Sequence, residues 1–260
     1  MEILTPVIIT AAIGLLAGIL LAAAAKFLAV PVDEKQIAIR ELLPGANCGG
    51  CGYSGCDGYA AAVASGEAAP NLCSPGGADT AKAIAAAIGA ECGDMVPNVA
   101  VVSCHGRNSK VRGSYNGAAS CAAAANLNGG PNACRYGCLG FGDCAAVCDN
   151  GAITVTDGVA AVDPAMCLGC GKCAAVCPRH LIAMAPLGAP AVLCRNSDKA
   201  PATRAVCTDG CLGCGKCVRV CPSEAVSLVG GVAVIDSGKC THCGKCADNC
   251  PVKSIAHPYN

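Results

Sequence analysis

Apolar residues are arranged along the chain in three ways, and each predicts a different element. Residues 7–25 form one almost wholly apolar run, which predicts a long helix. Segments 152–163 and 225–236 each contain two β-branched runs around a glycine, the pattern of a small β-hairpin. Alanine-rich segments at 58–67 and 79–90 predict two short helices. The chain is therefore expected to join one long apolar helix to small α+β domains.

The apolar run is expected to cross a membrane once. At about 1.5 Å per residue, residues 7–25 span roughly 28 Å, close to the thickness of the hydrocarbon core of a bilayer. Lys26, Lys35 and Arg40 follow the run and only Glu2 precedes it. The positive-inside rule then places the rest of the chain on the cytoplasmic side of the cell inner membrane. A cleaved signal peptide is the alternative, but it would have a basic start and a shorter apolar run.

Cysteine decides which chemistry is expected. The chain has 25 cysteines, an odd number that cannot pair fully into disulfides. Two runs have the spacing C-x₂-C-x₂-C-x₃-C-P of bacterial two-cluster ferredoxins, in which the fourth thiolate ligates the neighbouring cluster. Zinc usually takes C-x₂-C pairs separated by a longer loop, so a zinc-rich interaction protein is the non-redox alternative. The two runs are Cys167, Cys170, Cys173, Cys177 and Cys240, Cys243, Cys246, Cys250.

A different cysteine pattern follows the apolar run. Cys48, Cys51, Cys56 and Cys73 lie among many glycines, which let the backbone approach a cluster closely. This spacing predicts a domain that holds one [4Fe–4S] cluster, with the helix at 58–67 returning the chain to the fourth ligand. Cys92 has no evident partner and is expected to be a small buried thiol.

An internal repeat organises the C-terminal part of the chain. An offset of 73 residues maps nine cysteines from Cys121 to Cys177 onto nine from Cys194 to Cys250 without a gap. The repeat predicts two ferredoxin-like modules, each with two clusters. The expected ligand sets are Cys211, Cys214, Cys217 with Cys250; Cys240, Cys243, Cys246 with Cys221; and Cys167, Cys170, Cys173 with Cys148.

The remaining set of the first module departs from the repeat, because Phe141 stands where the second module has Cys214. Cys138, Cys144 and Cys177 then lack a fourth ligand, and Cys134 is the nearest replacement. The five sets use 20 cysteines. A sixth cluster is possible with four of the others, unless these are buried thiols: Cys104, Cys121, Cys194 and Cys207.

Composition limits the fold class. The 260 residues include no Trp and only two Phe, so clusters are expected to stabilise the small domains in place of large aromatic cores. We expect an α+β protein with an N-terminal transmembrane helix, a four-cysteine [4Fe–4S] domain and two tandem bacterial-ferredoxin-like modules. Their expected bounds are 1–30, 31–97, 98–193 and 194–260. Residues 98–260 carry fourteen bases against nine acids, which either offset anionic clusters or steer an acidic redox partner.

Several motifs together resemble the B subunit of the Rnf complex, an ion-pumping ferredoxin:NAD⁺ oxidoreductase of bacterial and archaeal membranes. They are the anchor followed by LLPG-x-NCGxCGxxGC, the later C-x-PGG, YNGAASC, GCLGFGDCAAVC and the two ferredoxin runs, so the resemblance covers essentially the whole chain. It implies an electron-transfer subunit that accepts electrons from reduced ferredoxin. The electrons would pass toward the Cys48–Cys73 site, the membrane subunits and finally NAD⁺, coupled to Na⁺ or H⁺ translocation.

No motif indicates bond chemistry by this chain alone. It contains no nucleophile–base pair, phosphate-binding glycine loop or flavin signature in a fitting context, so an electron carrier is expected. The expected partners are the other complex subunits, reduced ferredoxin and the lipid bilayer, with no nucleic acid. Two redox alternatives remain: a polyferredoxin relay of another membrane oxidoreductase, and an electron donor for an iron–sulfur transcription factor.

Overall fold

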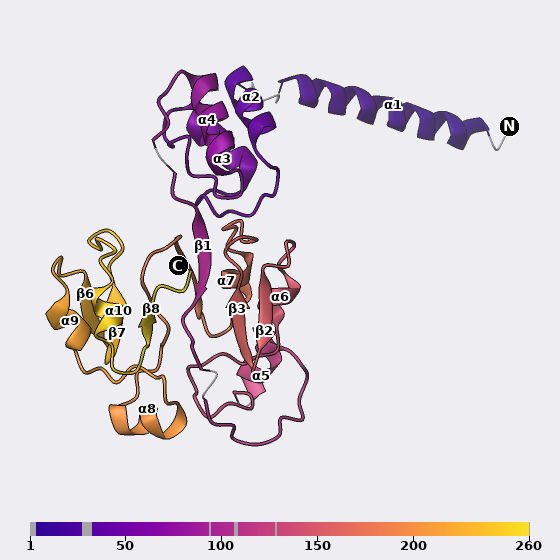
Figure 1. Ribbon diagram of the computed structural model, residues 1–260. Coiled ribbons are helices and arrows are strands. Elements are labelled where there is room, and N and C mark those ends of the chain that lie inside the picture. Colours follow the sequence, from indigo (N-terminus) through magenta and orange to yellow (C-terminus); the bar gives the residue numbers. More distant parts are fainter. Residues whose placement is uncertain (1–3, 28–32, 94, 107–108, 128, 260) are drawn as a thin grey trace.

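The computed structural model describes residues 4–27, 33–93, 95–106, 109–127 and 129–259. They form one isolated helix, a helical domain and two modules that mix short helices and strands (Figure 1). Segment 28–32, which contains the expected boundary between the anchor and the four-cysteine domain, lies outside the described residues.

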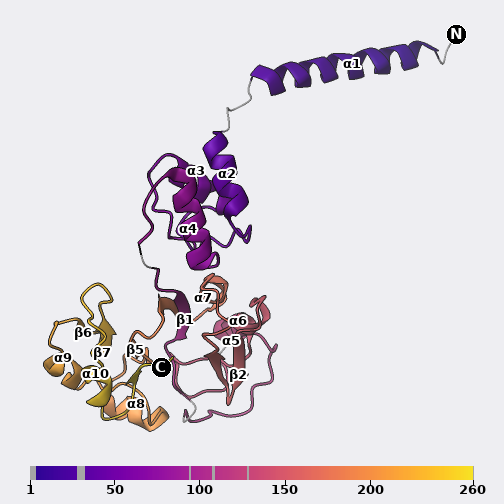
Figure 2. The same cartoon turned by 45° about the horizontal axis from the view of Figure 1, so that its top comes forward.

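Helix α1, Leu4–Phe27, extends away from the other elements (Figures 1 and 2). Its window Val7–Ala24 is long and apolar enough to cross a membrane, and none of the side chains described in it is buried. Apolar side chains such as Leu21, which is 71% exposed, cover the helix on all sides. Such a surface is costly in water and favourable in lipid. By length and composition, α1 is therefore a candidate membrane span.

Three helices build the domain that follows: α2 (Glu34–Leu42), α3 (Cys56–Ala64) and α4 (Gly77–Ile88). The Asp33 carboxylate caps α2 by accepting a hydrogen bond from the N–H of Lys35 at 2.9 Å. Helices α3 and α4 confirm the two helices that the alanine-rich segments predicted.

The core of this domain also positions its fourth cysteine. Ile39, Tyr59 and Ile84 are almost completely buried. The Tyr59 hydroxyl donates to the carbonyl of Ala69 at 2.8 Å and accepts from the N–H of Leu72 at 3.1 Å. These two bonds fix the returning segment directly before Cys73.

The first ferredoxin-like module is built around two antiparallel strand pairs. β1 pairs with β4, and β2 pairs with β3 in the hairpin that the sequence predicted at 152–163. Ala100, Ile153 and Ile182 lie in its core with several cysteines. Its elements are β1 (Asn98–Val102), α5 (Cys121–Leu127), α6 (Asp143–Ala146), β2 (Ile153–Thr156), β3 (Val159–Val162), α7 (Lys172–Val176) and β4 (Ile182–Pro186).

The second module repeats this plan. β6 and β7 form the hairpin predicted at 225–236, and β5 pairs with β8. Val226, Val232 and Ile255 form its apolar core. Its elements are β5 (Ala191–Val192), α8 (Ala200–Val206), α9 (Lys216–Val220), β6 (Val226–Val229), β7 (Val232–Ile235), α10 (Lys245–Asp248) and β8 (Ile255–Ala256).

In both modules, a glycine of the cysteine loop that precedes the hairpin packs against the turn of the hairpin. Gly140 and Gly213 have φ angles of +78° and +63°. A Cβ at Gly140 would lie 2.7 Å from the carbonyl oxygen of Gly158, and one at Gly213 would lie 2.5 Å from that of Gly231. Only glycine fits such contacts, so the 73-residue repeat extends to the placement of the cysteine loops.

The helical domain and the C-terminus both contact the first module. A Cβ at Gly50 would lie 3.3 Å from the carbonyl oxygen of Cys170, so the two cysteine loops are in direct contact. At the other end of the chain, the Tyr259 hydroxyl donates to the carbonyl of Ala100 in β1 at 2.6 Å. The first module thus contacts both the helical domain and the C-terminal segment; Figure 1 shows it below the helical domain and beside the second module.

Candidate metal centres

The cysteines of the helical domain lie close enough to interact electrostatically. The N–H of Cys56 donates to the Asn47 side-chain oxygen at 2.9 Å, which ties the loop before Cys48 to the start of α3. Burial raises the pKa of Cys73, and the thiols of Cys56, Cys51 and Cys48 raise it further. The structure thus brings together the four cysteines that the sequence predicted as one set.

A cavity between the helical domain and the first module contains another predicted set. Ala46 and Pro75 of the helical domain line it together with residues of the first module. The N–H of Ala100 donates to the Cys167 sulfur at 3.4 Å. Burial raises the pKa of Cys173 to about 11, and two neighbouring thiols add to this shift. The cysteines that line the cavity are Cys148, Cys167, Cys170 and Cys173.

A second cavity of the first module differs from the sequence expectation. The cysteines lining it are Cys121, Cys138, Cys144 and Cys177. Burial raises the pKa of Cys144 to about 12, with additional effects of the other three thiols. Cys134 was expected as the fourth member, but the structure places Cys121 here and Cys134 at a different cavity.

Asp143 holds Cys121 in this position. Its carboxylate accepts hydrogen bonds from the N–H groups of Cys121 at 2.9 Å and Ala122 at 3.0 Å, and from the Ser120 hydroxyl at 3.0 Å. Partial burial acts to raise the pKa of Asp143, but these hydrogen bonds outweigh it and lower the pKa. The ionised carboxylate therefore caps the start of α5. The second module has Lys216 at the equivalent position.

Phe141 fills the place of the ligand that the first module lacks. Its ring is tilted against that of Tyr115, with 4.9 Å between the centroids, and both pack on a small core around Ala124 and Leu139. This contact anchors the segment that leads into α5. The sequence assigns Cys121 to the expected sixth set, because Cys134 is the nearer replacement to Cys138 along the chain. The sequence does contain an indication of this ligand: Phe141 and Asp143 both depart from the repeat, which has Cys214 and Lys216 at these positions.

Five of the expected cluster ligands of the second module lie in one core. Cys211, Cys217 and Cys246 are buried there, with Cys221 and Cys250 packed against them. Burial acts to raise the pKa values of Cys221 and Cys250. Hydrogen bonds outweigh this effect and lower both pKa values, chiefly from Ser223 for Cys221 and from Ser254 for Cys250. Cys214 and Cys243 of the expected sets are exposed at the surface.

Four further cysteines line a cavity at the junction of the two modules, and we call them the junction thiols: Cys104, Cys134, Cys194 and Cys207. The expected sixth set contained Cys121 in place of Cys134, so the structure exchanges these two residues. Cys92 is partly exposed, with its thiol 3.5 Å from the carbonyl oxygen of Gly93, and is not the buried thiol that was expected.

The residues around the thiols fit [4Fe–4S] clusters. Backbone N–H groups of Ala100, Leu181 and Ala225 point at the sulfurs of Cys167, Cys177 and Cys221; such hydrogen bonds stabilise sulfur that carries negative charge. Most of the perturbed thiols have raised pKa values because thiolates are buried close together, so a cationic metal core would stabilise them. Among the described residues, no group of three or more Cys, His, Asp or Glu has a geometry suited to a single metal ion.

Comparison with protein families matches these parts of the chain. The family described as "Putative Fe-S cluster" matches residues 43–75. The family described as "4Fe-4S dicluster domain" matches residues 133–181, 166–225 and 210–254. These matches confirm the predicted fold class of a four-cysteine domain followed by ferredoxin-like modules.

Three relatives match most of the chain, and each is the B subunit of an ion-translocating oxidoreductase complex. That of the Na(+)-translocating ferredoxin:NAD(+) oxidoreductase complex of Acetobacterium woodii is 43% identical over 91% of this chain and 72% of its own length. The chain belongs to this family of Rnf B subunits. That of the proton-translocating ferredoxin:NAD(+) oxidoreductase complex of Clostridium ljungdahlii is 43% identical over 86% of the chain and 81% of its own length. For the relative from the ion-translocating oxidoreductase complex of Methanosarcina acetivorans, the identity is 37% over 91% of both chains. The family that the motifs resembled is confirmed.

Proposed function

We propose that this chain is the electron-input subunit of an Rnf-type complex. It accepts electrons from reduced ferredoxin and relays them toward membrane subunits and finally NAD⁺, coupled to Na⁺ or H⁺ translocation. When bound, [4Fe–4S] clusters supply one-electron oxidation and reduction at each thiol set. The observation that supports this role most strongly is a series of contacts along the chain of cysteines. Cys194 packs against the core of the second module, Cys104 packs against the core of the first module, and Gly50 of the helical domain contacts the Cys170 loop.

Five thiol sets, one to each cluster, form the relay in this proposal. The exchange of Cys134 for Cys121 gives every set four thiolates. Each ferredoxin-like module then holds two clusters, and the helical domain holds one. The sets are Cys48, Cys51, Cys56, Cys73; Cys148, Cys167, Cys170, Cys173; Cys121, Cys138, Cys144, Cys177; Cys211, Cys214, Cys217, Cys250; and Cys221, Cys240, Cys243, Cys246.

The second module is the input end of this relay. Its ligands Cys214 and Cys243 are exposed, and an exposed lysine follows each of them two residues later, Lys216 and Lys245. Residues 194–260 carry eight bases and five acids. An acidic ferredoxin would be attracted to this surface, and its electron would enter where a ligand reaches the surface.

The helical domain is the output end. It follows α1 in the chain, and its cysteine loop contacts the Cys170 loop of the first module through Gly50. With α1 in the bilayer, Lys35 and Arg40 place this domain and both modules on the cytoplasmic side of a single-pass anchor. The Cys48–Cys73 site then lies nearest to the membrane subunits that receive the electrons.

Ferredoxin-dependent bleaching of the full-length chain tests this function. The chain is purified anaerobically in detergent and mixed with reduced ferredoxin in a stopped-flow instrument. We expect rapid loss of visible absorption. The variant Lys216→Glu/Lys245→Glu should react about tenfold more slowly at low salt, and the difference should shrink at high salt.

Lys82→Glu is the matched control, because Lys82 is equally exposed but lies on α4 of the helical domain. It should leave the rate unchanged. Bleaching by dithionite but not by ferredoxin would contradict the input role.

A further inference from the structure

The junction of the two modules is built by the segment that follows β1. This segment contains Cys104, and its Lys110 N–H donates to the carbonyl of Val206 in α8 at 2.8 Å. The carbonyl of Lys110 accepts from the N–H of Ala133 in the first module at 2.7 Å. The N–H of His105 donates to the carbonyl of Leu193 at 3.0 Å. The cavity with the junction thiols is therefore bordered by a segment that hydrogen-bonds to both modules.

The junction thiols line one cavity, in which Cys207 is buried and the other three are half-buried. Burial raises the pKa of Cys104 to about 11, with contributions from Cys138 and Cys134. Burial also raises the pKa values of Cys194 and Cys207, and Cys134 contributes to both shifts. Clustered thiolates without a positive charge would be unfavourable here, whereas a metal core would offset their repulsion.

In each module, the backbone N–H of a cluster ligand contacts one of the junction thiols. The N–H of Cys138, from the first module, donates to the Cys104 sulfur at 3.4 Å. The N–H of Cys211, from the second module, donates to the Cys194 sulfur at 3.2 Å. The junction thiols thus lie between the Cys138 set and the Cys211 set.

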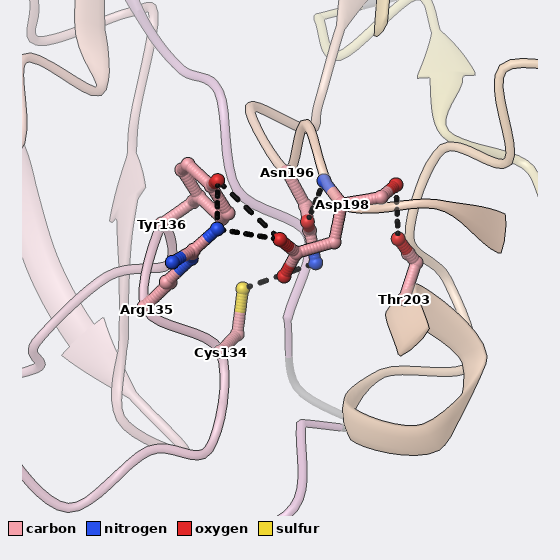
Figure 3. A network of polar contacts seen from close by, with 6 residues as sticks. All are labelled: Cys134, Arg135, Tyr136, Asn196, Asp198 and Thr203. Atoms are coloured by element: carbon pink, nitrogen blue, oxygen red, sulfur yellow. Dashed lines mark hydrogen bonds and ion pairs between the residues drawn. The ribbon is translucent and has the colours of Figure 1, made fainter. Parts of the chain in front are cut away.

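Asn196 adds a side-chain hydrogen-bond donor to the backbone N–H groups that contact the junction sulfurs. It is 2% exposed, and its amide nitrogen donates to the Cys134 sulfur at 3.7 Å (Figure 3). The amide oxygen accepts from the N–H of Asp198 at 2.8 Å, which fixes the orientation of the amide. The Asp198 carboxylate is in turn held by Arg135 of the first module at 2.7 Å. This network crosses the junction and aims a buried N–H at sulfur.

We propose that the junction thiols ligate a [4Fe–4S] cluster through which electrons cross between the two modules, and that Asn196 is a positioning residue that raises its reduction potential. The inference rests on the proposed function for the chemistry of the other five sets. One electron leaves the Cys211 set, is held at the junction and leaves for the Cys138 set. Because each arrival is matched by a departure, no proton or chemical group needs to be transferred.

Iron content of the full-length, anaerobically purified chain tests the ligand set. The variant Cys134→Ser/Cys207→Ser should contain about four fewer irons than the unmodified chain, because one cubane is lost. The EPR signals of the other clusters should be retained. Cys92→Ser, a change of a cysteine outside every set, should leave the iron content unchanged. Unchanged iron content in the double variant overturns the junction site.

A redox titration followed by EPR tests the role of Asn196. Asn196→Asp keeps the acceptor for Asp198 but cannot donate to Cys134 when ionised, so iron content should be retained while one midpoint potential falls. The shifted signal must be the one that the double variant lacks. Asn126→Asp adds the same charge at an exposed position of α5 and should shift nothing. If the iron is retained and no midpoint potential shifts, Asn196 has only a structural role, and the proposal that it raises the reduction potential is overturned.

Stopped-flow reduction by reduced ferredoxin tests the crossing. In the unmodified chain all clusters should bleach together. In the double variant only the clusters of the second module should bleach rapidly, and the rest should lag at least tenfold. Uniform rapid bleaching of the double variant overturns the crossing but leaves the proposed function intact. Failure of the unmodified chain to react would instead overturn the proposed function.

Discussion

Removal of the Asp143 carboxylate should loosen the Cys121 set selectively. Its three hydrogen bonds cap α5, and loss of such a cap costs about 0.5–2 kcal/mol. Asn retains one acceptor oxygen, so Asp143→Asn should cost about 1 kcal/mol, whereas Asp143→Ala should cost about 2 kcal/mol. If one cluster is lost through local opening of α5, its rate of loss should rise about fivefold in Asp143→Asn and about thirtyfold in Asp143→Ala. The pKa of the Asp143 carboxyl lies below its ordinary value of 3.8. The carboxylate is therefore fully ionised at neutral pH, and its stabilising effect is lost only in acid.

The assay is anaerobic release of iron to a chelator at pH 7.5, with EPR to identify the cluster that disappears first. Asp157→Asn is the matched control, since it removes the same charge from the exposed β2–β3 turn of the same module. Asn tolerates the positive φ of +52° at this position. Equal release rates for Asp143→Asn, Asp157→Asn and the unmodified chain would refute the reasoning about Cys121.

Three other predictions concern the thiol sets. Cys121→Ser should abolish the EPR signal of one first-module cluster, and the added change Phe141→Cys should restore it by supplying the ligand present in the repeat; no recovery would mean that the Phe141 site cannot reach the cluster. Gly213→Ala should lower the melting temperature and the iron content, because its Cβ would meet the Gly231 carbonyl oxygen at 2.5 Å; a normal melting curve with full iron content would contradict this close packing. Since the raised pKa of Cys144, about 12, keeps its thiol protonated below that pH, cluster reconstitution should release protons and proceed faster at pH 9 than at pH 7, as followed by visible absorption; equal rates would show that deprotonation does not limit assembly.

Local patterns were sufficient to predict most of the fold. The hairpins at 152–163 and 225–236 and the helices α3 and α4 formed where β-branched and alanine-rich segments predicted them. These elements depend on neighbouring residues, so the chain reveals them directly. The 73-residue repeat also carried the plan of one module over to the other.

The exchange of Cys121 and Cys134 could not be derived from spacing. Cysteine spacing identifies ligands that are close in sequence, and it favoured Cys134 because this residue lies near Cys138. The actual arrangement depends on long-range contacts, namely the cap that Asp143 provides to α5 and the contact of Phe141 with Tyr115. Such contacts become visible only in the folded chain. The repeat was misleading here, because it aligns Cys121 with the junction thiol Cys194.

Iron and sulfide quantitation of the anaerobically purified full-length chain tests the central claim most directly. The five thiol sets of the relay predict about 20 irons per chain, and the junction set raises this to about 24, with about as many inorganic sulfides, at four of each per cubane. Visible absorption should be broad and should bleach on reduction. A folded, colourless protein that contains zinc or disulfides in place of iron would contradict the account.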